Sequence, residues 1–324
     1  MNFFFSKTPA ESKNDISIIL IDIFNINFIN IMKFKIVFFV IFLSFSCEDT
    51  IPLEHLEWQK KRKEDLFADD GYLNIAGLFP IQNGTYSMGS KEGSDIKLPR
   101  EMPLSLAEVV VKDSIISFNF FSTVILNDSI EARNISYNYF KNKNFFSIEN
   151  FVWFVHLDSG VKAIRLRDLK HPLLTMDLEI DFFPYSSSNI ISGKFQKYQQ
   201  PKVVNFSNFL GGIFIDTIPG KINFKYRGIN YSLEPTISPS GNFFIAFGDK
   251  TNGKETYGGG RYLYVMPEDS LGNVTIDFNK SLNPPCVFST FTTCPVPRSE
   301  NIMNVKIEAG EKNYDGLLFS SVYQ

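Results

Sequence analysis

From Gly71 onward the sequence consists of short segments rich in β-branched and aromatic residues, separated by Gly, Pro, Asn and Asp. Short runs between turn residues are typical of β-strands. They recur about every ten residues, which favours an antiparallel sandwich or barrel. Hairpin turns are expected at Pro219-Gly220 and Arg227-Gly228. The expected strands are residues 106–112, 114–121, 152–156, 163–167, 190–195, 202–206, 212–216, 221–226, 229–234, 243–248, 261–266, 274–277 and 305–307.

An amphipathic helix is expected ahead of these strands, at residues 53–70. Leu53, Leu56 and Phe67 lie on one face of this segment. The sequence Asp69-Asp70-Gly71 ends it, because Gly and Asp favour turns over helix.

The Asn-rich stretch at residues 127–150 suggests a boundary between two β units. A small β unit is expected at residues 71–135 and a larger β domain at residues 150–320. The predicted fold class is therefore mainly β, with an N-terminal helix, a small β-sandwich and a larger antiparallel β-sandwich or barrel.

Residues 32–46 have a short basic start, an apolar run and small residues, and Cys47 follows. This order is that of a signal peptide, and the apolar run of about ten residues is too short to span a bilayer, which takes about 20. Leu43 to Ser46 resemble a lipobox, so lipidation of Cys47 is expected; cleavage without lipidation and a buried thiol are the alternatives. Residues 1–31 are then interpreted as translated upstream DNA, and residues 47–52 as anchor and tether.

The acidic residues Glu48 and Asp49 bear on the location. They resemble the export tag of surface lipoproteins of the Bacteroidetes, whereas an acidic residue there can retain lipoproteins at the inner membrane in other bacteria. The expected location is the cell envelope, with the protein attached to a membrane through its lipid. The outer membrane is favoured, facing either the periplasm or the surface.

The charge pattern gives no indication of a nucleic-acid partner. The formal net charge is −3, and Lys and Arg are scattered along the chain. Proteins that bind nucleic acid usually carry a clustered basic surface. We therefore expect none.

Two cysteines, Cys286 and Cys294, remain once Cys47 is used. An even pair in an oxidising envelope favours a disulfide that closes a short loop. A reduced structural pair is one alternative, and a metal or catalytic role is another. The histidines His55, His156 and His171 do not stand at ligand spacing from the cysteines, so no metal and no other cofactor is expected.

Several motifs together resemble one family, the domain of unknown function 1684 family, over roughly residues 53–315. The motifs are Trp58 with Arg62, G-Y-L-N-I-A-G-L-F from Gly71, G-S-x-x-x-S-D-I-K-L-P from Gly89, T-Y-G-G-G-R-Y-L-Y from Thr256, D-F-N-K-S-L-N-P-P-C from Asp277, Cys294-Pro295, Glu300-Asn301 and E-A-G-E-K from Glu308. The chain resembles a lipoprotein member of Bacteroidetes type. The resemblance implies a family and no activity.

Residues 89–99 also resemble the opening of forkhead-associated domains, small β-sandwiches that bind phosphothreonine. The resemblance implies that the small β unit has this shape. Ser90 stands where those domains place an arginine. An arginine is the usual donor to a phosphate, so the ligand is not carried over.

Polar residues concentrate in four patches of the C-terminal half, at residues 165–168, 249–261, 277–283 and 308–311. Strand ends gather at one rim of a sandwich or barrel, so these patches are expected to line one cleft. The candidate ligand-binding residues are Arg167, Asp168, Asp249, Tyr257, Gly260, Arg261, Asn283 and Glu308. The alternative is that the acids cap turns, the arginines form buried ion pairs and the glycines allow tight backbone.

The run Gly258-Gly259-Gly260 could hold a small anion on its backbone N–H groups beside Arg261, or form a tight turn. It lacks the lysine of a P-loop and precedes a strand, which disfavours a nucleotide.

The leading functional hypothesis is a binding protein of the cell envelope that holds a glycan or small anion in this polar cleft. A hydrolase that uses carboxylates among Asp249, Asp277, Glu308 and Glu311 is the first alternative. A nucleophilic Cys286 would require His156 or His171 nearby as a base. A structural or partner-docking lipoprotein is the other alternative, and whether the protein is an enzyme stays open.

Overall fold

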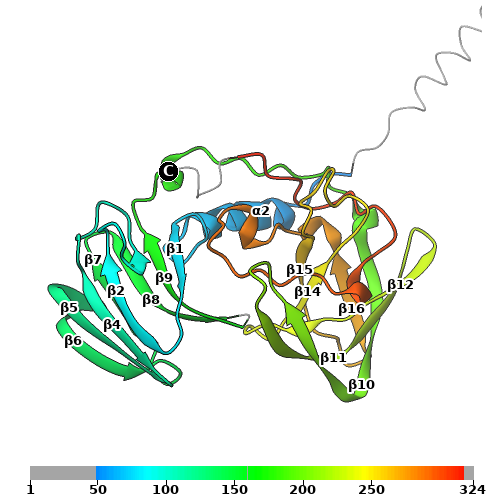
Figure 1. The fold of residues 1–324 in the computed structure, drawn as a ribbon. Coiled ribbons are helices and arrows are strands. Elements are labelled where there is room, and N and C mark those ends of the chain that lie inside the picture. Colours follow the sequence, from blue (N-terminus) through cyan, green and yellow to red (C-terminus); the bar gives the residue numbers. More distant parts are fainter. Residues whose placement is uncertain (1–48, 159, 317–324) are drawn as a thin grey trace, which may run out of the picture. The chain divides into compact units, whose positions relative to one another are not determined.

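The computed structural model describes residues 49–158 and 160–316, and the described residues from Thr50 onward belong to one unit. The fold is mainly β, as predicted (Figure 1). The strands are β1 (Ile75–Pro80), β2 (Gly84–Gly89), β3 (Ile96–Lys97), β4 (Ala107–Lys112), β5 (Ile115–Leu126), β6 (Ile130–Asn138), β7 (Phe145–Ile148), β8 (Phe151–Asp158), β9 (Val161–Asp168), β10 (Ile190–Ser207), β11 (Ile213–Tyr226), β12 (Ile229–Leu233), β13 (Thr236–Ile237), β14 (Phe243–Phe247), β15 (Arg261–Val265) and β16 (Asn273–Asp277). The signal-peptide segment and Cys47 lie outside the described residues.

The helix α2 (Leu53–Phe67) forms where it was expected, but the predicted buried face is wrong. Leu53 and Leu56 are 71% and 46% exposed, whereas His55, Arg62 and Leu66 are buried. Tertiary partners select this side of the helix. The ring of His55 packs 5.0 Å from that of Tyr185, and Arg62 pairs with a buried carboxylate.

The first sheet has nine strands in the order β1-β9-β8-β7-β5-β4-β2-β3, with β6 paired to β5. Its core contains Phe118, Phe146 and Trp153. The rings of Phe118 and Phe146 are 4.9 Å apart, and that of Trp153 is 5.9 Å from Phe146. These aromatic side chains therefore pack together in the core of the first sheet.

This sheet continues past the boundary expected at residues 127–150. Asn127 and Asp128 have φ angles of 49° and 63° and form the turn between β5 and β6. Asn and Asp tolerate this left-handed conformation better than most residues. The Asn-rich composition therefore marks hairpin turns, and the chain leaves the first sheet only after Asp168.

Two smaller sheets follow, with the orders β12-β11-β10-β16 and β13-β14-β15. Arg227-Gly228 is the turn between β11 and β12, as predicted, with φ angles of 47° and 83°. Pro219-Gly220 was expected as a turn but lies inside the long strand β11, where the pairing with β10 shifts register. A Cβ on Gly220 would lie 2.4 Å from the carbonyl oxygen of Gln196, so the glycine serves a close backbone approach.

Strands β14 and β15 have large side chains on both faces. Phe243, Ile245 and Phe247 alternate along β14 and enter the second core with Leu263 and Val265 of β15. The intervening residues of these strands lie on the opposite face. The expected strand at residues 305–307 is absent, although Ile307 is buried in the same core.

Candidate functional site

Asp249 and Arg261 form an ion pair that is closed to solvent. Arg261 Nη2 lies 2.7 Å from Asp249 Oδ2, and both side chains are 0% exposed. Arg261 also donates to the carbonyl oxygens of Ile307, at 2.8 Å, and Ala309. Asp249 accepts the N–H of Thr251 at 2.7 Å. The pair thus fastens a C-terminal segment without regular structure to the start of β15.

Glu311 is the centre of a second buried group. Its carboxylate accepts Arg62 Nε at 2.7 Å and the backbone N–H of Asn283 at 2.7 Å, and it is 0% exposed. The amide of Asn283 donates to the carbonyl oxygen of Lys312 at 2.8 Å. Arg261 joins the two groups, because its Nη1 lies 3.5 Å from the Glu311 carbonyl oxygen.

Three of the four polar patches therefore converge, but in the interior of the protein. The buried charges named above are all paired within the chain, as buried charges usually are. Of the neighbouring polar atoms, Arg261 Nε and Asn283 Oδ1 have no hydrogen-bond partner among the described residues. Asp277, in the third patch, caps a short helix by accepting the N–H of Asn279 at 3.0 Å. These carboxylates are consequently poor candidates for hydrolytic acids and bases.

The remaining patch, residues 165–168, belongs to the first sheet. Arg167 donates to Asn74 Oδ1 at 2.6 Å and to the carbonyl oxygen of Asp70 at 3.0 Å, which holds the connection between α2 and β1. Asp168 is buried and accepts the N–H of Lys170 at 2.9 Å. Arg167 also lines a cavity of about 760 Å³, and Tyr137 is another of its lining residues.

Of the remaining predicted binding residues, Tyr257 and Gly260 belong to one turn, in which the N–H of Gly260 donates to the carbonyl oxygen of Tyr257 at 3.2 Å. Gly260 has a φ angle of 89°, and a Cβ there would lie 2.4 Å from Pro297 Cγ, so it serves a tight turn. Tyr257 is half-buried, with its ring 6.1 Å from that of Phe209. Glu308 is on the surface, 3.6 Å from Arg227.

Cys286 and Cys294 are present as free cysteines, and the expected disulfide is not shown. Their contact is a hydrogen bond from the backbone N–H of Cys286 to Cys294 Sγ, at 3.0 Å. A side-chain hydrogen bond with Cys294, and then burial, raise the pKa of the Cys286 thiol. A thiolate nucleophile at Cys286 is therefore disfavoured.

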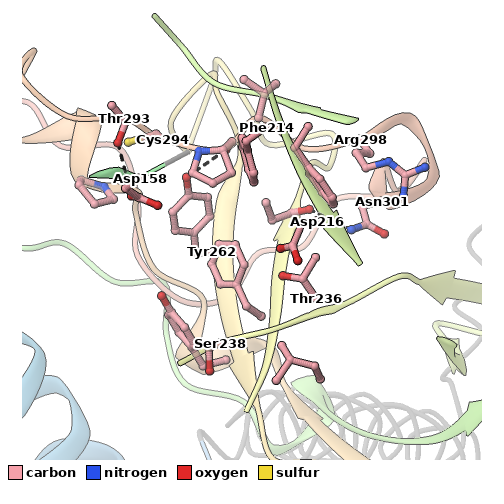
Figure 2. A pocket seen from close by; sticks show the side chains of 18 of the residues that line it. Asp158, Phe214, Asp216, Thr236, Ser238, Tyr262, Thr293, Cys294, Arg298 and Asn301 are labelled. Atoms are coloured by element: carbon pink, nitrogen blue, oxygen red, sulfur yellow. Dashed lines mark hydrogen bonds between the residues drawn. The ribbon is translucent and has the colours of Figure 1, made fainter. Parts of the chain in front are cut away.

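A cavity of about 460 Å³ lies over the face of β13, β14 and β15 that is turned away from the core (Figure 2). The cross-strand register places Thr236, Phe244 and Tyr264 in one row on this face. The aromatic residues that line the cavity are Tyr72, Phe206, Phe214, Phe244, Tyr262 and Tyr264. The charged and polar residues that line it include Asp158, Asp216, Glu234, Thr236, Ser238, Thr293, Arg298 and Asn301.

The aromatic side chains of the cavity contact one another in two groups. The ring of Phe244 lies 5.2 Å from that of Tyr264 and 4.9 Å from that of Tyr262. On the opposing strands Phe206 and Phe214 stack at 5.3 Å. Tyr264 is 48% exposed. The ordinary pKa of tyrosine is about 10, so its hydroxyl keeps its proton at neutral pH and can both donate and accept.

Two polar groups of the cavity retain unused hydrogen-bonding capacity. Thr236 is 7% exposed, yet its hydroxyl makes no hydrogen bond to any residue that the structure describes. Asp216 accepts one hydrogen bond, from the N–H of Thr217 at 2.7 Å, and has no ion-pair partner within residues 49–158 and 160–316. β11 and β13 are in contact, and Figure 2 shows both side chains at the same part of the cavity.

The other charges of the cavity compensate one another. Glu234 accepts Lys202 Nζ at 2.5 Å and Arg298 Nη1 at 2.9 Å. Arg298 is shared with Glu300, at 2.8 Å from Nη2. These pairs stiffen one end of the cavity.

Thr293 connects the cavity to a buried histidine. Its hydroxyl lies 3.5 Å from Asp158 Oδ2 and 3.3 Å from His156 Nε2. Burial, and then Arg165 and Arg167, lower the pKa of His156 to about 3. A histidine with so low a pKa is neutral and a weak base near pH 7. In the described part of the chain no three His, Cys, Asp or Glu side chains form a metal-binding group.

Residues 178–312 match the family model described as "Protein of unknown function (DUF1684)". This match assigns residues 178–312 to the DUF1684 family. The DUF1684 region carries most of the cavity, from Phe206 to Asn301, together with the Asp249–Arg261 pair. Tyr72 and Asp158 also line the cavity, but they lie outside the matched residues 178–312.

The solved structures include a similar chain, the solution NMR structure of an uncharacterized protein from Haloarcula marismortui. It is 24% identical, and the alignment covers 41% of the chain described here and 75% of that chain, with a TM-score of 0.35. No curated protein matches the sequence.

None of the predicted binding residues lines the 460 Å³ cavity. Its lining comes from aromatic residues on the outer faces of strands, to which the sequence analysis gave no functional role. One sequence signal could have found them. Phe244, Tyr262 and Tyr264 alternate with core residues in strands that are apolar on both faces, although one face of an antiparallel sheet commonly meets solvent.

Proposed function

We propose that this protein binds a small polar ligand of glycan type in the cavity between β11 and the β13-β14-β15 sheet. The observation that carries the proposal is a row of aromatic side chains beside two polar groups with unused hydrogen-bonding capacity, Thr236 Oγ1 and the Asp216 carboxylate. A cavity of about 460 Å³ is within the usual range for small-molecule sites, about 300–1,000 Å³.

The composition of the walls fits a polyhydroxylated ring. The C–H faces of a sugar are apolar and can pack on Phe244 and Tyr264, whose rings supply large contact area. Its hydroxyls can donate to Asp216 and exchange hydrogen bonds with Thr236 and the Tyr264 hydroxyl. Leaving these groups unpaired while burying them under a different ligand would cost about 1–3 kcal/mol each.

The test is a thermal-shift screen of envelope glycans against the wild type and two variants. Tyr264→Ala removes one aromatic wall, and Met266→Ala removes an exposed side chain of similar location that does not line the cavity. We expect a glycan that stabilises the wild type and Met266→Ala, and binds Tyr264→Ala about tenfold more weakly. Stabilisation that persists in Tyr264→Ala, or no stabilisation by any glycan, would contradict the proposal.

We further propose that the protein is exported to the cell envelope and anchored through a lipid on Cys47, with the outer membrane as the favoured site. The support is the order of residues 32–47 in the sequence. Within the described residues, no helix is long and apolar enough to cross a membrane. Mass spectrometry of the mature N-terminus should find acyl chains on Cys47, and a product that begins elsewhere without them would exclude this anchor.

A further inference from the structure

We infer that the ligand of this cavity carries a positively charged amine, as an amino sugar does, and that Asp216 receives it. This inference rests on the proposed function and concerns the charge of the ligand. It departs from the sequence-based expectation, which allowed a small anion.

The charges that line the cavity favour a cation. The lining contains three carboxylates, those of Asp158, Asp216 and Glu234, and one guanidinium, that of Arg298. Glu234 is also paired with Lys202, which lies outside the lining. Arg298 is already held between Glu234 and Glu300, at 2.9 and 2.8 Å. An anionic ligand would have to displace one of these carboxylates, so no cationic group of the lining stands ready to receive it.

Asp216, unlike Arg298, has no ion-pair partner among the described residues. Its neighbour in the cavity is the hydroxyl of Thr236, a buried side chain without a hydrogen-bond partner in the described part of the chain. Asp216 is half-buried, and its one hydrogen bond comes from the adjacent backbone N–H of Thr217. An ammonium donates three hydrogen bonds, so it can bond to the Asp216 carboxylate and the Thr236 hydroxyl at the same time. Hydrogen bonds between charged groups are about twice as strong as neutral ones.

The aromatic walls favour the same ligand. A cation within about 6 Å of a ring centroid is attracted by the negative face of the ring. Phe244 and Tyr264 lie on the opposing sheet, next to Thr236 in the strand register. A carboxylate, a free hydroxyl and two aromatic faces together therefore select a ring that is apolar on its face and bears an ammonium at its edge.

Isothermal titration of the full chain with three sugars tests the inference. Glucosamine carries the amine, N-acetylglucosamine has the same ring with the amine neutralised, and glucuronate carries a negative charge instead. We expect glucosamine to bind at least tenfold more tightly than either of the others. This preference should be lost in Asp216→Asn and kept in Glu268→Gln, a matched change of an exposed acid outside the cavity.

The outcomes separate this inference from the proposed function. Equal binding of glucosamine and N-acetylglucosamine would overturn the role of charge and leave a glycan site in place. Preference for glucuronate, or no binding of any of the three sugars, would also overturn it. The glycan screen with Tyr264→Ala then decides separately whether the cavity binds sugars at all. If Asp216→Asn does not fold, the affinity of the wild type for glucosamine must fall as NaCl is raised, and an affinity independent of salt would overturn the inference.

Discussion

Replacing Asp249 by Asn should destabilise the fold severely, because it removes the counter-ion of a fully buried arginine. The Arg261 guanidinium is 0% exposed, and Asp249 is its only carboxylate within 4.0 Å among the described residues. The carbonyl oxygens of Ile307 and Ala309 would remain as acceptors. Removing one partner of a buried pair typically costs about 3–5 kcal/mol, against a total stability of about 5–15 kcal/mol for a domain.

Urea unfolding provides the assay, with the free energy of unfolding taken from the midpoint and a shared slope. The matched control is Glu308→Gln, whose partner Arg227 is 3.6 Å away and where both side chains are about half exposed. Exposed pairs contribute about 0–1 kcal/mol, so this variant should unfold close to the wild type. The double variant Asp249→Leu with Arg261→Met should be more stable than Asp249→Asn, since no uncompensated charge remains.

The reasoning would be refuted if Asp249→Asn lost no more stability than Glu308→Gln. If it also abolished ligand binding while folding normally, Asp249 would be a binding residue, as the sequence analysis expected. The measured free energy of unfolding therefore distinguishes a structural role of this polar motif from a functional one.

Two further outcomes follow from buried groups. Gly260→Ala should lower the free energy of unfolding by about 2 kcal/mol or more. The new Cβ would lie 2.4 Å from Pro297 Cγ, at a φ angle of 89°. Gly258→Ala is the control in the same urea assay and should be close to neutral, because no atom lies nearer than 3.7 Å to its new Cβ. Burial lowers the pKa of His156 to about 3 and that of His171 to about 4, so the folded state resists protonation more than the unfolded chain does. The free energy of unfolding should be constant above about pH 6.5 and fall below it by at most about 1.4 kcal/mol per pH unit and histidine; urea midpoints that stay constant down to about pH 5 would contradict this.

Local patterns were sufficient to predict most strands, because alternation and turn residues act within a few positions of each other. Arg227-Gly228 could be read in this way, since its left-handed φ angles are a local requirement. The role of Pro219-Gly220 could not be predicted in this way, because the glycine is required by the close approach of a backbone carbonyl on the neighbouring strand β10. The buried side of α2 was missed for the same reason, since Glu311 and Tyr185 select it from far along the chain.

The site was harder to predict than the fold, because the sequence does not show whether a polar side chain is exposed to water or buried. The C-terminal segment around Ile307 and Glu311 has little regular structure, so its backbone and charges must find partners elsewhere in the chain. The partners of this segment are Arg261, Asp249 and Arg62. The high density of polar residues in these motifs therefore reflects buried pairing.

The cavity has the reverse signature in the sequence. Phe214, Phe244 and Tyr264 are spaced like any strand residues that pack in a core, and only the arrangement of the sheets leaves them facing a hollow. Asp216 is one acid among many until its lack of an ion-pair partner in the described residues is known. An apolar residue that the fold fails to bury, and a charge that it fails to pair, are both properties of the tertiary structure. Mutations chosen from Asp216 and Tyr264 should therefore affect binding with little loss of stability, and those at Asp249 and Arg261 should do the opposite.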